Sequence, residues 1–164
     1  MNPEYLKILE NARKKSSENK KFLEKLKAKK PKDLDILTNE LHDEAFEQIN
    51  CLECANCCRT TGPLLLNKDI DRLASELKLK PSIFAERYIR VDEDNDYVFT
   101  RMPGPFLGSD NYCHVYEARP NACREFPHTQ QRNILQKLKI TYHNTLICPA
   151  VVLVVEGLKE KLKV

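Results

Sequence analysis

The sequence predicts a mainly α-helical fold of the small α+β class, with a minor β-hairpin. Apolar residues recur every three or four positions along several stretches, which is the period of one buried helical face. One short stretch, 97–100, has the aromatic and β-branched residues that favour a strand. With 41% hydrophobic residues among 164, the chain can bury a core and form one domain with an appended segment.

Two helical segments are expected in the first third of the chain. Residues 3–30 carry two short apolar stripes on either side of a polar stretch, 13–21, so this helix is expected to be broken or weakly packed. The next segment keeps a regular apolar period up to Ile49. We therefore expect a Lys-rich helical extension over 1–48 and a second domain over 49–164.

The middle of the chain is expected to form two helices and the hairpin. Asn67 is suited to cap one helix, and Pro81 is suited to begin the next. The acidic stretch 92–96 marks a turn in front of the strand over 97–100. A second extended piece is expected over 112–116.

Two more helices are expected near the C-terminus. The segment 130–139 has helical character. The β-branched run 150–155 also suits a strand, but Pro149 at a first helical position and Leu158 further on favour a helix. This run is the longest apolar one, and it is too short to span a membrane.

The N-terminus predicts a soluble, cytoplasmic protein with a basic arm. Residues 1–7 contain no apolar core of a signal peptide. Residues 1–32 hold 11 basic against four acidic side chains, whereas the remaining residues carry a net charge of −4. The basic arm could bind nucleic acid or an acidic protein, and the alternative is a solvated helix face.

The seven cysteines are the main candidate functional residues of the sequence. An odd number cannot all pair, and in a reducing cytosol clustered thiols are more often metal ligands or catalytic groups than disulfides. Four of them form the pattern Cys51-x-x-Cys54-x-x-Cys57-Cys58, in which tight turns aim sulfurs at one ion. Adjacent Cys57 and Cys58 tend to point in different directions, so one of them could serve a second metal or lie next to the ligands without binding the metal.

Three further cysteines, Cys113, Cys123 and Cys148, are dispersed along the chain. Distant ligands that close a local loop are typical of sites where metal binding also stabilises the fold. The alternative for each is a buried small side chain. We expect six or seven of the cysteines to belong to one site, with His114 and His128 as candidate nitrogen ligands.

Two arginines beside Cys123 could offset the charge of such a site. Four thiolates on Zn²⁺, or on an oxidised [4Fe–4S] cluster, leave a net charge of about −2. Arg119 and Arg124 are placed to donate to sulfur or to nearby carbonyl oxygens. Ordinary surface salt bridges are the alternative.

The cysteines and their surroundings resemble the YkgJ-type cysteine-cluster family, a zinc- or iron-chelating CxxCxxCC domain. The resemblance covers residues 49–150 and includes the cluster at 51–58, the Leu-Asn-Lys-Asp-Ile-Asp-Arg-Leu segment at 66–73, Cys-His-Val-Tyr at 113–116, the Arg-Pro-x-x-Cys-Arg-Glu-Phe-Pro segment at 119–127, and Cys-Pro at 148–149. Relatives commonly carry another cysteine where this sequence has Gly104. The resemblance implies metal chelation; members of the family are labelled iron–sulfur oxidoreductases, and a similar cluster occurs in flagellin lysine methylases.

Thiolate ligands select zinc, iron–sulfur clusters or copper(I). The first three cysteines have ferredoxin-like spacing, but the fourth follows immediately and not after three residues. No P-loop, G-x-G-x-x-G or H-E-x-x-H motif accompanies them. The leading expectation is a metal-binding protein that holds zinc or an iron–sulfur cluster. The alternatives are an iron–sulfur oxidoreductase or transfer enzyme, and a zinc-stapled interaction module with a basic N-terminal arm.

Overall fold

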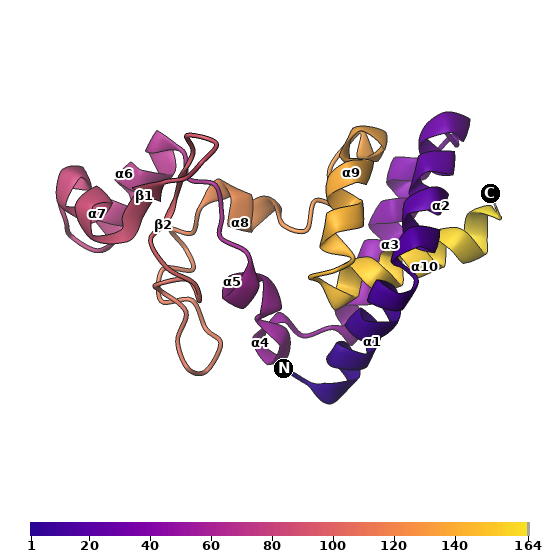
Figure 1. The fold of residues 1–164 in the computed structure, drawn as a ribbon, viewed down its shortest axis with the longest axis horizontal. Coiled ribbons are helices and arrows are strands. Elements are labelled where there is room, and N and C mark those ends of the chain that lie inside the picture. Colours follow the sequence, from indigo (N-terminus) through magenta and orange to yellow (C-terminus); the bar gives the residue numbers. More distant parts are fainter. Residues whose placement is uncertain (164) are drawn as a thin grey trace. The chain divides into compact units, whose positions relative to one another are not determined.

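The computed structural model describes residues 1–163, which form two compact units. Unit 1 joins Met1–Cys54 to the segment that begins at Pro127, and unit 2 is Ala55–Phe126. The described chain is mainly α-helical with an antiparallel hairpin, as predicted (Figure 1). The compact units divide the chain after Cys54 and after Phe126. The functional domain boundary expected after residue 48 stays a prediction.

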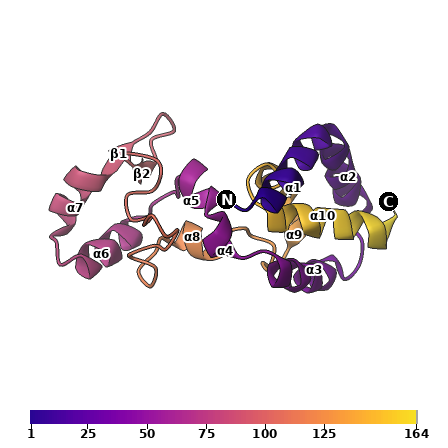
Figure 2. The same ribbon diagram turned by 90° about the horizontal axis from the view of Figure 1, so that it is seen from below.

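Unit 1 is a set of packed helices from both ends of the chain (Figure 2). Its helices are α1 (Pro3–Lys14), α2 (Ser16–Lys29), α3 (Leu34–Gln48), α4 (Cys51–Cys54), α9 (Ile134–Asn144) and α10 (Pro149–Leu162). Helix α10 packs against α1, α3 and α9, and α2 packs against α9. The N-terminal helical segment is broken at Lys15, between α1 and α2, as the sequence predicts.

Helix α10 supplies much of the apolar centre of unit 1. Val151 and Val155 are fully buried, so the β-branched run forms the predicted helix. Pro149 takes the first helical position, where its missing N–H leaves no helical hydrogen bond unmade. At Gly157, α10 approaches α3 so closely that a Cβ would lie 2.5 Å from Leu41 Cδ2. Within the described part of the chain, no helix is both long and apolar enough to cross a membrane.

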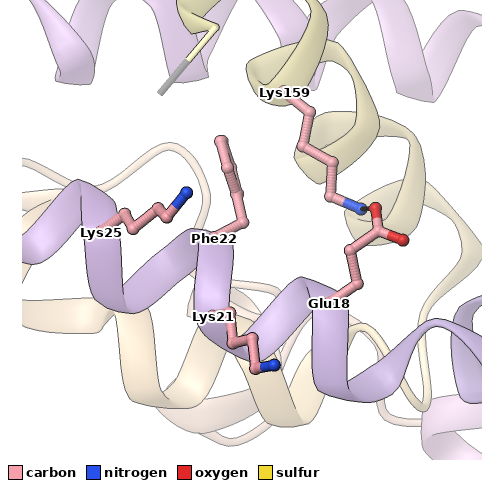
Figure 3. Close-up of a pocket in the computed structure, with 5 residues that line it drawn as sticks. All are labelled: Glu18, Lys21, Phe22, Lys25 and Lys159. Carbon is pink, nitrogen blue, oxygen red and sulfur yellow. Dashed lines mark hydrogen bonds and ion pairs between the residues drawn. The ribbon is translucent and has the colours of Figure 1, made fainter.

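Ionic contacts link α2 to α10. Lys159 Nζ on α10 donates to Glu18 Oε1 on α2 at 2.8 Å, beside a shallow hollow lined also by Lys21, Phe22 and Lys25 (Figure 3). Burial disfavours the charge of Lys159, but hydrogen bonds to Glu18 and a second glutamate outweigh this effect and raise its pKa. Lys21 and Lys25 stay exposed, and docking of a polyanion on the basic arm stays a prediction.

Unit 2 is built from short elements around an aromatic core. The elements are α5 (Asn56–Thr60), α6 (Asn67–Glu76), α7 (Pro81–Tyr88), β1 (Ile89–Val91), β2 (Tyr97–Phe99) and α8 (Asn121–Glu125). Phe84 on α7 is fully buried, and its ring centroid lies 6.2 Å from that of Phe106. The Phe106 ring also lies 5.6 Å from Phe99 and 5.0 Å from Tyr88. These ring contacts tie the loop that contains Phe106 to α7 and β2.

The two strands form the predicted minor hairpin. β1 and β2 pair antiparallel, with Val91 opposite Tyr97. The acidic stretch forms the expected turn, in which the Asp92 carboxylate accepts hydrogen bonds from the amides of Asp94 at 3.0 Å and Asp96 at 2.9 Å. The sequence indicated β2 but not β1, because β1 follows α7 with no Gly or Pro to mark a boundary.

Two local expectations for unit 2 are wrong. Asn67 does not cap α6; the cap position is Leu66, whose N–H donates to Asp69 Oδ2 at 3.0 Å. The segment 112–116 is not a strand, and within it Cys113 forms an isolated bridge. A hydrogen-bonded turn begins at Cys113 and ends the extended conformation.

Helix α9 begins later than the segment 130–139 predicts. It starts at Ile134, because the Asp35 carboxylate on α3 accepts hydrogen bonds from Asn133 N at 2.8 Å and Ile134 N at 2.9 Å. These bonds satisfy amide groups that have no partner inside the helix. The helix start is therefore set by a residue of a different helix.

Candidate metal centre

The seven cysteines divide between the two units. The unit 1 thiols are Cys51, Cys54 and Cys148, and the unit 2 thiols are Cys57, Cys58, Cys113 and Cys123. The cysteine motif at 51–58 crosses the boundary, with its first two cysteines on α4 and its last two on α5. Ala55 separates these helices and has a left-handed backbone with φ of 47°.

Hydrogen bonds to Asn50 shape the turn that carries Cys51 and Cys54. Asn50 Oδ1 accepts from Leu52 N at 3.0 Å, and the Asn50 carbonyl accepts from Cys54 N at 3.2 Å. The backbone N–H of Asn50 donates to the hydroxyl of buried Tyr5 at 2.9 Å. Helix α1 thus fixes the start of α4.

Cys148 is buried at the N-cap of α10. Burial raises the pKa of its thiol to about 12, although the Val151 and Ala150 amides at the start of the helix favour the thiolate. The negative charges of Cys51 and Cys54 raise this pKa further, so the unit 1 thiols lie within electrostatic reach of one another. A cation bound among them would offset these charges and favour the thiolates.

Helix α5 presents Cys57 and Cys58 side by side, with their Sγ atoms 3.9 Å apart. The hydrogen bond from Cys57 lowers the pKa of the Cys58 thiol to about 7. Burial opposes this shift, whereas the positive charge of Arg59 adds to it. Cys58 is therefore in part a thiolate at neutral pH.

Cys113 and Cys123 complete the unit 2 thiols. Burial raises the pKa of the Cys113 thiol, and the charge of Cys58 raises it further. Cys123 is exposed as a residue, but protein atoms around its sulfur, together with the charges of Cys58 and Cys113, raise the pKa of its thiol to about 12. Cys58, Cys113 and Cys123 thus interact electrostatically.

Backbone hydrogen bonds connect Cys58 to the loop that leads to Cys113. Gly104 N donates to the Cys58 carbonyl at 3.0 Å, and His114 N donates to the Phe106 carbonyl at 2.9 Å. A Cβ at Gly104 would lie 3.6 Å from the Cys58 oxygen, an ordinary contact. Gly104 therefore lies beside Cys58, with space for a Cβ.

Arg119 and Arg124 bind backbone carbonyls, which is one of the two roles expected for them. Arg119 Nη1 donates to the Tyr116 carbonyl at 2.7 Å, and its guanidinium lies 3.8 Å from the centroid of the Tyr116 ring. Arg124 donates from Nε to the Arg119 carbonyl at 3.1 Å and from Nη2 to the Glu117 carbonyl. The Arg119 charge acts against the raised pKa values of two unit 2 thiols.

An ion pair on α6 was not among the predicted site residues. Asp69 is 1% exposed, and its Oδ1 accepts from Arg72 Nη2 at 2.5 Å and from Asn121 N at 3.0 Å. Arg72 also donates to the carbonyls of Ala118 at 3.1 Å and Arg119 at 2.9 Å. The available sequence signal was the spacing of Asp69 and Arg72, which puts them on one helix face.

The donor set of the two groups fits zinc or iron, because both metals are bound by thiolates in proteins. Among residues 1–163, no group of three or more His, Cys, Asp or Glu side chains converges closely enough to hold a metal ion. The assignment of the seven cysteines as ligands therefore stays a prediction, as do one common site and ligation by His114 or His128.

We expect iodoacetamide to alkylate Cys58 before Cys113 and Cys123 in the metal-free chain at neutral pH. The thiolate is the nucleophile, so the labelling rate of Cys58 should rise with pH around a midpoint of about 7, whereas Cys123, with a pKa of about 12, should react slowly. Peptide mass spectrometry across a pH series measures both rates. Cys57→Ala removes the hydrogen bond that lowers the Cys58 pKa, and an unchanged midpoint in this variant would contradict the explanation.

Comparison with known proteins identifies the family of the chain. A family model named CxxCxxCC, described as "Putative zinc- or iron-chelating domain", matches residues 50–149. No curated protein and no solved structure matches the chain. The matched region contains all seven cysteines and more than half of the sequence. The chain therefore belongs to the CxxCxxCC family of zinc- or iron-chelating domains, as its sequence resemblance implied.

Proposed function

We propose that the protein binds zinc or iron through two separate thiol sets, one in each unit. The observation that carries the proposal is the division of the seven cysteines, with three in unit 1 and four in unit 2, where the Sγ atoms of Cys57 and Cys58 lie 3.9 Å apart. The charges of Cys51 and Cys54 on Cys148, and of Cys58 on Cys113 and Cys123, follow the same division. A cation bound among such thiols would favour their joint deprotonation, because it offsets the repulsion between the thiolates. The proposal thus differs from the single site of six or seven cysteines expected from the sequence, which stays the alternative prediction.

The two sets differ in how completely they can surround a metal. In unit 2, Cys57 stands beside Cys58, so four thiolates are available to close a tetrahedral site, as in structural zinc sites. In unit 1, three thiols leave one tetrahedral position for water, a substrate or another ligand. Unit 2 is thus the proposed structural site, and unit 1 is the proposed site with an open position.

Metal binding at either set requires loss of thiol protons. Because the pKa values of Cys123 and Cys148 are raised to about 12, both residues are neutral thiols before a cation arrives at physiological pH. Binding therefore releases protons and weakens as the pH falls. Arg119 carries the positive charge that partly offsets the added negative charge in unit 2.

Metal analysis of single-cysteine variants tests the proposal. The full chain is freed of metal, saturated with Zn²⁺ without oxygen, and analysed for zinc per chain. We expect Cys123→Ser and Cys148→Ser each to lose one of two zinc equivalents, and the double variant to lose both. A folded wild-type chain that retains no zinc, or a single variant that loses all of it, would contradict two separate sites.

The metal held after anaerobic purification decides between zinc and an iron–sulfur cluster. Iron with acid-labile sulfide and visible absorption would assign a cluster, whereas a colourless protein with stoichiometric zinc would assign zinc sites. Cys123→Ser and Cys148→Ser, analysed in the same way, show which unit holds which metal.

A further inference from the structure

Asp69 holds together two segments of unit 2 that are far apart in sequence. Its Oδ2 accepts from Leu66 N at 3.0 Å, at the start of its own helix α6. Its Oδ1 accepts from Asn121 N at 3.0 Å, at the start of α8. Helix α8 carries Cys123, so a carboxylate on α6 sets the position of the helix on which this thiol lies.

The Arg72 side chain binds backbone carbonyls of the neighbouring turn at 118–119. Its Nε donates to the Ala118 carbonyl at 3.1 Å, and its Nη2 donates to the Arg119 carbonyl at 2.9 Å and to Asp69 Oδ1 at 2.5 Å. The turn lies between Cys113 and Cys123 in the chain. The planar fork of the guanidinium suits such paired contacts, which a lysine ammonium cannot reproduce in the same geometry.

The geometry points to Asp69 and Arg72 as positioning residues of the proposed unit 2 metal site, which orient the 118–121 segment that leads into α8 and Cys123. This inference rests on the proposed function. Neither residue is a ligand in it; both act through the backbone between the two cysteines. Residues that orient metal ligands in this way commonly change metal affinity by about 10–100-fold when they are substituted.

A direct electrostatic role for Asp69 predicts the opposite sign. The negative charge of Asp69 disfavours the Cys123 thiolate. If this charge were the only contribution of Asp69, a neutral residue at position 69 would favour metal binding. If Asp69 acts by position, its removal weakens metal binding. The direction of the change in affinity therefore separates the two roles.

The test uses zinc protection of each cysteine against alkylation in the full chain, with free Zn²⁺ set by a chelator buffer and each peptide read by mass spectrometry. We expect Asp69→Asn to need roughly 10–100-fold more free Zn²⁺ to protect Cys113 and Cys123, with protection of Cys148 unchanged. Arg72→Lys keeps the positive charge but loses the fork, and we expect it to weaken protection in the same direction. The Arg72 side chain is 35% exposed, which makes this variant the safer one for folding.

Asp35→Asn is the matched control. Asp35 also uses its carboxylate to bind amides at the start of a distant helix, but that helix lies in unit 1 and carries no cysteine. Protection of Cys113 and Cys123 should stay at the wild-type zinc concentration. Equal loss in this control, or wild-type or tighter protection in both Asp69→Asn and Arg72→Lys, overturns the positioning role. A wild-type chain whose thiols zinc never protects overturns the proposed function and, with it, this inference.

Discussion

Saturation with zinc is expected to raise the free energy of unfolding of unit 2 by several kcal/mol. A ligand that binds only the folded state, present at a free concentration of about 1,000 times its Kd, stabilises that state by roughly 4 kcal/mol. Unit 2 has a small core, and much of its length lies in loops held by individual hydrogen bonds. Hydrogen exchange of the α6 and α7 amides, with Zn²⁺ and with a chelator, measures the change within this unit.

Two cysteine variants define what this result means. Cys123→Ser should remove most of the zinc-dependent protection of α6 and α7, because it deletes a proposed ligand on α8. Cys148→Ser should leave that protection intact, because Cys148 belongs to unit 1. Zinc-independent exchange of α6 and α7 in a chain that binds zinc would show that the metal does not stabilise unit 2.

Phe84→Ala is expected to destabilise unit 2 by about 3–5 kcal/mol, the usual cost of deleting a buried phenylalanine. Phe84 is fully buried, and its ring contacts those of Tyr88 and Phe106. A stability loss of this size is a large part of the total for a small unit, so the metal-free variant should lose protection throughout α6 and α7. Hydrogen exchange of the metal-free chain provides the measurement.

The exposed Leu64 provides the control for this substitution. Leu64 belongs to the same unit and is 43% exposed, so Leu64→Ala should change the free energy of unfolding by about 0.5 kcal/mol or less. Protection of α9 and α10 in unit 1 should remain in both variants. Similar losses in Phe84→Ala and Leu64→Ala would contradict the assignment of Phe84 to the core.

The sequence predicted those elements whose cause lies within the element itself. Helix α10 follows from Pro149 and its apolar period, and the hairpin turn follows from the run of acidic residues at 92–96. The starts of α6 and α9 were mispredicted because carboxylates set them, Asp69 by reaching back to Leu66 and Asp35 from another helix. The Asp69 contact is the capping-box spacing of three residues, a local signal that the choice of Asn67 as the cap overlooked. The Asp35 contact comes from a different helix, so local spacing does not contain it.

The same distinction holds for the candidate site. The cysteine pattern and the family resemblance were sufficient to predict zinc or iron chelation, and the family match supports it. Which thiols influence one another depends on the fold, since Cys148 interacts with Cys51 and Cys54, which lie 97 and 94 residues earlier in the chain. The roles of Asp69 and Arg72 likewise depend on backbone atoms about 50 residues away, which no local motif encodes.

The left-handed residue Ala55 gives the cysteine motif a modular character. It lies between α4, which carries Cys51 and Cys54, and α5, which carries Cys57 and Cys58. The single sequence motif therefore forms two short helices. In the proposed function, Cys148 would join the first half and Cys113 and Cys123 the second. If the two proposed sites are independent, a protein engineer could alter one half of the motif and leave metal binding at the other unchanged.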